Sequence, residues 1–115
     1  MTDLGSSDRL AAALAHLATT IDARAAEGDS SSSWTAKLLA KGPDACAEKV
    51  HEEGQELAEA VIRESDARVA SEAADVLYHA LVALRSRGVS LDDVAASLES
   101  RQGTSGIDEK AARKD

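Results

Sequence analysis

Residues 43–87, PDACAEKVHEEGQELAEAVIRESDARVASEAADVLYHALVALRSR, decide the fold class of this chain. Their apolar residues recur every three or four positions, and nothing in the stretch alternates over a useful length as a β-strand would. Ser65 and Asp66 interrupt the pattern and can cap a following helix. We therefore predict one helix over about residues 43–64 and a second over about residues 67–87. Their short connection predicts antiparallel packing.

The flanking sequence extends the helical pattern. Residues 42 and 43, Gly-Pro, end one helical segment and suit the start of the next. The further predicted elements are a helix from Ser7 or Asp8 to about residue 26, a polar loop at residues 27–33, a short helix over Trp34–Lys41 and a last helix to about residue 100, opened by a capping box at residues 90–93. The predicted fold class is all-α, an antiparallel helical bundle of about four helices plus a short helical segment. Residues 1–101 form its single domain, and residues 102–115 are predicted to be a disordered tail.

The composition indicates a thin hydrophobic core. The chain has 115 residues, enough for one domain, and its apolar content is mostly alanine, with no Phe, one Trp and one Tyr. Small side chains bury little area each, and apolar area is worth about 25 cal/mol per Å². We therefore expect homodimerisation to complete the bundle by burying further apolar surface.

The charge balance restricts the partners. With 21 acidic residues against 13 Lys and Arg, the chain is a poor binder of nucleic acid. Its apolar runs are far shorter than a membrane span. The first ten residues do not resemble a secretory signal, and the single cysteine, Cys46, cannot form an internal disulfide, so we expect a cytoplasmic protein. A small anionic substrate is compatible with this charge if metal ions separate it from the carboxylates.

Acidic residues gather on one face of the helix predicted over residues 43–64. Glu52 and Glu56 lie one turn apart on a narrow stripe, and Glu53 is turned toward the apolar side. Like charges at this spacing cost about 0.2–0.5 kcal/mol per pair, and a face made only for solvation usually interleaves lysine. Glutamate is also a good helix former, so an EExxE pattern by itself is a weak signal of metal binding.

The following helix repeats the acidic pattern. Glu72, Asp75 and His79 fall on one stripe, and antiparallel packing would place Glu72 with Glu56 toward the shared turn and Glu53 beside the level of Asp75 and His79. Carboxylates along one seam repel unless they are protonated or bridged by cations. All-oxygen ligands suit Mg²⁺ or Mn²⁺ better than zinc. The predicted metal ligands are Glu52, Glu53, Glu56, Glu72 and Asp75.

Two motifs, KVHEEGQE at residues 49–56 and EAADVLYH at residues 72–79, resemble those of the all-α nucleotide pyrophosphohydrolases of the MazG-like superfamily. The segments SWTAKLL at residues 33–39, KGP at 41–43 and RGVSL at 87–91 make the chain most similar to the phosphoribosyl-ATP pyrophosphohydrolase family of histidine biosynthesis. The resemblance covers about residues 10–98. Gly54 departs from it, because a better helix former is usual inside EExxE.

The resemblance implies a helical homodimer that hydrolyses the α–β phosphoanhydride of 1-(5-phosphoribosyl)-ATP to phosphoribosyl-AMP and pyrophosphate. It also implies that the EExxE and ExxD carboxylates hold Mg²⁺. Some relatives are fused to a cyclohydrolase with Cys and His metal ligands, for which one Cys leaves no room. Two alternatives stay open: a house-cleaning pyrophosphohydrolase of the same fold acting on (deoxy)nucleoside triphosphates, and a non-catalytic acidic dimerisation module.

Hydrolysis of a diphosphate link requires charge neutralisation and an oriented water. Glu53 and Glu72 are the candidate catalytic residues, with Glu72 either a metal ligand or the base that positions the water. Lys37, Lys41 and Lys49 are the candidates for binding the phosphates, although each could be an ordinary surface or ion-paired lysine.

Two further side chains have alternative roles. Trp34 could stack on a base, although packing in the core is the commoner role of a lone tryptophan. Asp75 and His79, four residues apart, could form a carboxylate–imidazole pair behind the metal, and an ordinary surface histidine is an equal alternative.

Overall fold

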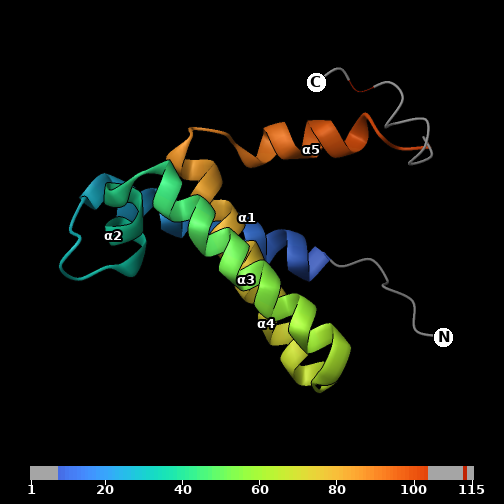
Figure 1. The fold of residues 1–115 in the computed structure, drawn as a ribbon. Coiled ribbons are helices and arrows are strands. Elements are labelled where there is room, and N and C mark those ends of the chain that lie inside the picture. Colours follow the sequence, from blue (N-terminus) through green and yellow to red (C-terminus); the bar gives the residue numbers. More distant parts are fainter. Residues whose placement is uncertain (1–7, 104–112, 114–115) are drawn as a thin grey trace.

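The computed structural model describes residues 8–103 and Arg113, and the regular structure in that part of the chain is entirely helical (Figure 1). The helices are α1 (Asp8–Glu27), α2 (Trp34–Lys41), α3 (Pro43–Arg63), α4 (Asp66–Ser86) and α5 (Leu91–Glu99). The predicted all-α class and the order of its elements are confirmed. Their ends differ from the predicted ones by about one residue, the usual variation at helix termini.

The long helices α3 and α4 form an antiparallel hairpin, the main packing unit of the fold (Figure 1). Pro43 takes the first position of α3, where its missing N–H would be unpaired anyway. The Ser65 hydroxyl caps α4 by accepting a hydrogen bond from the backbone N–H of Arg68. The short turn between the caps holds the two helices side by side.

The hydrophobic core lies at the end of the hairpin away from the α3–α4 turn. Its buried members are Ile21 of α1, Leu38 of α2, Cys46 of α3, and Leu81 and Val82 of α4. At the turn end, by contrast, Val61 and Ile62 are 64% and 72% exposed. Helices α1 and α2 therefore support the hairpin at its core end, and the turn end projects beyond them (Figure 1).

The last helix begins as predicted but stands apart from the others. Gly88 follows α4 in the left-handed region, with φ 71°, and the Ser90 and Asp93 side chains complete a capping box at the start of α5. No residue of α5 is buried, and Leu98 is 60% exposed. Figure 1 shows α5 extending away from the end of α4, so the bundle within one chain consists of α1 to α4. Its completion by homodimerisation stays a prediction.

The tail predicted at residues 102–115 falls mostly on residues 104–112, 114 and 115, which lie outside the described residues. Gln102 and Gly103 belong to a turn. No helix among those described is long and apolar enough to cross a membrane.

Candidate active site

The antiparallel packing of α3 and α4 brings the predicted acidic residues to one seam. The Nε2 atom of His79 lies 3.7 Å from Oε1 of Glu53, so these two residues are at the same level, as the predicted register required. Closer to the turn, the charge of Glu56 acts on Glu72 across the two helices. The seam therefore runs from the Glu53–His79 level toward the α3–α4 turn.

Glu53 lies within the seam and is mostly covered by its neighbours. Its side chain is 12% exposed, and its Oε2 atom is buried without a hydrogen-bond partner among the described residues. A hydrogen bond with the Glu56 side chain, burial, and the Glu56 charge raise the pKa of Glu53 from 4.5 to about 7. The charge of Lys49 opposes this rise in pKa, and that of Asp75 adds to it. A cation bound beside this carboxyl group would favour its ionised form.

Glu72 lies on the α4 side of the seam and is 4% exposed. Burial raises its pKa, the Arg68 charge opposes the rise, and the Glu56 charge and a side-chain hydrogen bond with Asp75 add to it. Asp75 itself is exposed. Four of the five predicted ligands, Glu53, Glu56, Glu72 and Asp75, thus interact with one another.

The fifth, Glu52, is held by a lysine. Its Oε1 atom lies 3.3 Å from Nζ of Lys49, and its side chain is 47% exposed. The sequence places Lys49 one turn before Glu53 as well, but Glu53 is turned inward against His79 and Glu52 takes the ion pair. Lys49 still lowers the pKa of Glu53 through its charge.

The carboxylates share a neighbourhood but do not converge on one point. Among residues 8–103 and Arg113, no three His, Cys, Asp or Glu side chains are placed to hold one metal ion together. Two of the five predicted ligands have a basic partner: Lys49 lies against Glu52, and the Arg68 Nη2 atom lies 3.6 Å from Oε2 of Glu72. Binding one ion with all five would therefore require side chains to rotate.

A groove of about 430 Å³ opens over the turn end of this seam. Its lining residues are Glu52, Gln55, Glu56, Glu59, Glu64, Arg68 and Glu72. Arg68 is the basic residue of this lining; its Nε atom lies 3.2 Å from Oε1 of Glu64, and its Nη2 atom reaches Glu72. Sequence reasoning missed Arg68. The available signal was its spacing, four residues after Glu64 and four before Glu72.

His79 is also more closely bound to the site than the sequence suggested. It is 6% exposed, so the surface interpretation is wrong, and its neighbouring carboxylate across the helices is Glu53. Burial lowers the pKa of His79, and Lys49 lowers it further, whereas Asp75 and Glu52 oppose them. Burial therefore favours the neutral form of the imidazole that faces Glu53. Within residues 8–103 and Arg113, its buried Nδ1 atom has no hydrogen-bond partner.

The predicted phosphate-binding lysines lie on two helices. The Nζ atoms of Lys37 on α2 and Lys49 on α3 are each 6.0 Å from the ring centroid of Trp34. Trp34 is 48% exposed and is not a member of the core, which contradicts its expected packing role. Lys41, one turn beyond Lys37, is exposed at the end of α2. The structure thus brings Lys37 and Lys49 together and leaves Lys41 aside.

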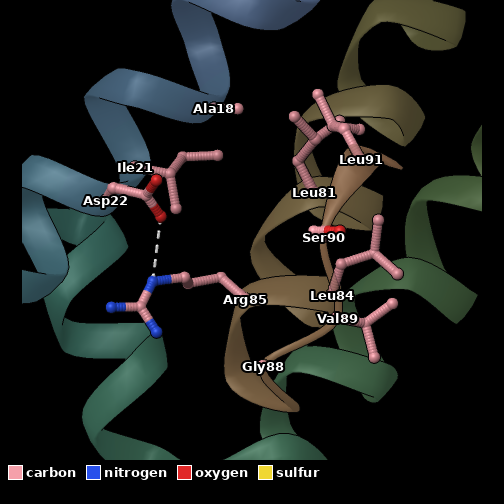
Figure 2. Close-up of a pocket in the computed structure, with 10 residues that line it drawn as sticks. All are labelled: Ala18, Ile21, Asp22, Leu81, Leu84, Arg85, Gly88, Val89, Ser90 and Leu91. Carbon is pink, nitrogen blue, oxygen red and sulfur yellow. Dashed lines mark ion pairs between the residues drawn. The ribbon is translucent and has the colours of Figure 1, made fainter. Parts of the chain in front are cut away.

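A second cavity, of about 270 Å³, lies between α1, the end of α4 and the start of α5 (Figure 2). Apolar side chains form most of its wall, among them Ile21, Leu81 and Leu84, and at its edge the Nε atom of Arg85 lies 3.0 Å from Oδ1 of Asp22. None of the predicted site residues lines it. The acidic groove is therefore the candidate active site.

Comparison with known proteins gives a consistent result. A family model described as phosphoribosyl-ATP pyrophosphohydrolase matches residues 14–102. The chain is 59% identical over 100 residues to the phosphoribosyl-ATP pyrophosphatase of a strain of Cereibacter sphaeroides, a match that covers 87% of this chain and 96% of the relative. It is similar to the proteins of the same name from Rhodobacter capsulatus, at 56% identity with 88% and 97% coverage, and Ruegeria pomeroyi, at 59% identity with 84% and 91% coverage.

Proposed function

The chain belongs to the phosphoribosyl-ATP pyrophosphohydrolase family, and from this premise we propose that it hydrolyses the α–β phosphoanhydride of 1-(5-phosphoribosyl)-ATP. Water adds to the phosphoanhydride, the bond between the α-phosphorus and the bridging oxygen breaks, and phosphoribosyl-AMP and pyrophosphate leave. This is the second step of histidine biosynthesis, and we place it in the cytoplasm. The observation that carries the proposal is the acidic groove between α3 and α4, in a chain whose family match spans nearly all described residues.

The groove has the wrong charge for a polyphosphate unless cations take part. We propose Mg²⁺, or Mn²⁺, held by Glu52, Glu53, Glu56, Glu72 and Asp75. Two features support this choice: all five donors are hard carboxylate oxygens, and the buried Oε2 of Glu53 has no hydrogen-bond partner in the part of the chain that the structure describes. When bound, the ion supplies positive charge for phosphate oxygens and lowers the pKa of water.

The protein's own residues are proposed to accept the proton and to bind the phosphates. We propose that Glu53 or Glu72, both largely buried in the seam and ionised once cations bind, accepts the proton that the attacking water releases, with Glu72 either in this role or as a metal ligand. Lys37, Lys41 and Lys49 are proposed to bind phosphate oxygens. Lys49 and the groove-lining Arg68 are nearest to the acids. Once cations neutralise the carboxylates, these two side chains can turn to the phosphates.

We also propose that the working unit is a homodimer. The exposed apolar residues Val61, Ile62 and Leu77 on the hairpin, and Leu98 on α5, support this proposal, because a second copy would bury them. A four-helix unit with few large buried side chains gains stability from such burial.

The test of the proposed function is pyrophosphate release from phosphoribosyl-ATP, measured beside a panel of deoxynucleoside triphosphates with and without Mg²⁺. We expect Mg²⁺-dependent turnover of phosphoribosyl-ATP and little turnover of the panel. Broad triphosphate hydrolysis would indicate the house-cleaning alternative, and no turnover at all would indicate a non-catalytic module.

A matched pair of variants tests whether Glu53 is required for hydrolysis. Glu53→Gln keeps the shape of the side chain and should abolish turnover with the helical content intact. Glu48→Gln removes the same charge from an exposed position one turn before Glu52 and should retain it. Turnover retained in Glu53→Gln would remove Glu53 from the mechanism.

A further inference from the structure

Trp34 is placed where a ligand can reach it. It is the single tryptophan of the chain and the first residue of α2, and nearly half of its surface, 48%, is exposed. Burying an indole ring in the core would contribute stability, because aromatic side chains bury a large apolar area. Trp34 does not make this contribution in full, because it lies outside the core, even though the core contains few large side chains. An exposed aromatic ring in such a chain is a candidate binding surface.

The segment that carries Trp34 is held firmly. On one side, Ser33 caps α2 by accepting a hydrogen bond from the Ala36 N–H. On the other, Thr35 is buried and its hydroxyl shares a hydrogen bond with the hydroxyl of Tyr78 on α4. The backbone of Trp34 is therefore fixed relative to the hairpin, so the position of the ring does not have to be ordered when a ligand binds.

Two lysine ammonium groups lie near this ring, and one of them also contacts the acidic seam. The Nζ atoms of Lys37 and Lys49 are both 6.0 Å from the ring centroid, a distance at which an ammonium group is attracted to an indole face. The Nζ atom of Lys49 is also 3.3 Å from Oε1 of Glu52. A single lysine thus bridges the ring and the proposed metal ligands, which makes the ring an immediate neighbour of the site of hydrolysis.

We propose that Trp34 stacks on the purine ring of the nucleotide while Lys37 and Lys49 bind its phosphates. The inference rests on the proposed function and adds to it the residue that recognises the base. In a nucleotide, one ribose separates the base from the α-phosphate. In the protein, one lysine side chain, Lys49, separates the Trp34 ring from the acidic seam, so a base on the ring would place its phosphates toward the seam. An aromatic face next to ammonium groups suits a ligand that combines a flat heterocycle with phosphates.

Fluorescence provides the first test, because Trp34 is the only tryptophan of the full chain. AMP titrated in the presence of Mg²⁺ at fixed protein concentration should quench or shift the indole emission saturably. Ribose 5-phosphate and pyrophosphate, which carry charge but no base, should not reproduce the effect. An equal effect of ribose 5-phosphate, or none from AMP, overturns the proposal.

Kinetics on phosphoribosyl-ATP provide the second test. Trp34→Leu should raise KM about ten- to hundredfold, the factor that one base–aromatic stack contributes, and change kcat less than about threefold. Trp34→Phe keeps an aromatic face and should remain within about threefold of the wild-type KM. An unchanged KM in Trp34→Leu overturns the proposal.

A weaker dimer in Trp34→Leu, measured by sedimentation equilibrium without a change in KM, would instead make Trp34 an interface residue. Failure of the inference and failure of the proposed function are distinguishable. If the wild type does not cleave phosphoribosyl-ATP, the proposed function fails, and the AMP titration still decides whether Trp34 binds a purine.

Discussion

Replacing Glu53 with Gln should make the metal-free protein more stable at alkaline pH and leave its stability almost unchanged at acidic pH. The pKa of Glu53 is about 7 in the folded chain against an ordinary 4.5, so between these values the folded chain keeps a proton that the unfolded chain releases. Stability therefore falls as the pH rises from about 4.5 to about 7 and is level above that. At about 1.4 kcal/mol per pH unit the whole interval is worth about 3 kcal/mol, and solvent beside the exposed Glu56 screens it to about 1–2 kcal/mol.

Urea unfolding in the presence of a metal chelator measures this effect, with protein concentration held fixed because dimer formation would also change the apparent stability. The free energy of unfolding of Glu53→Gln should exceed that of the wild type by about 1–2 kcal/mol near pH 8 and by less than about 0.5 kcal/mol near pH 4. The exposed control Glu48→Gln should stay within about 0.5 kcal/mol of the wild type at both. A Glu53→Gln protein that is less stable than the wild type near pH 8, or a gain that does not vary with pH, would refute the reasoning.

Three further predictions concern the same hairpin. Mg²⁺ should raise the thermal unfolding midpoint of the wild type, EDTA should reverse the rise, and Glu53→Gln should show a smaller one; equal rises in both proteins would exclude Glu53 as a ligand of the proposed metal ion. Arg68→Gln removes the cation 3.6 Å from Glu72, so the pKa of Glu72 should rise further, and urea midpoints should show a greater loss of stability near pH 8 than near pH 4. Ser65→Ala removes the cap of α4 and should cost about 1 kcal/mol, which lowers the midpoint by about 4–8 °C in calorimetry, whereas Ser65→Asp should recover most of the loss.

The helices were predictable because their ends depend on local chemistry. A serine before a helix, as at Ser65 and Ser90, supplies the hydroxyl that the first free N–H groups need, and the residues involved are within three positions of one another. Gly88 adopts a positive φ for an equally local reason. Because the connection at Ser65 is short, α3 and α4 can pack against each other only in an antiparallel arrangement. The same register places Glu53 opposite His79, so the acidic seam also follows from the sequence.

What the sequence could not supply is which side chains the other helices cover. The core-packing alternative for Trp34 and the surface alternative for His79 were wrong, because the exposure of Trp34 and the burial of His79 depend on how α2 lies against α3 and α4. Lys49 is within reach of both Glu52 and Glu53 along the helix, and its choice of Glu52 depends on Glu53 being turned inward. Each of these outcomes is decided by tertiary contacts, which periodicity and spacing do not contain.

The position of the seam in the hairpin explains how the fold tolerates its repulsion. The buried side chains of the core join α1 and α2 to the start of α3 and the second half of α4, whereas Glu56 and Glu72 lie toward the turn, where Val61 and Ile62 are exposed. Like charges therefore oppose packing mainly outside the hydrophobic core, and the core end can hold the helices together regardless of the state of the carboxylates. Lys49 and Arg68 reduce the repulsion in this structure by lying against Glu52 and Glu72. Under the proposed function, cations on the carboxylates would release both side chains at the same place where phosphates need positive charge. Metal ion and substrate should therefore favour each other's binding through ion pairs that the folded chain already contains.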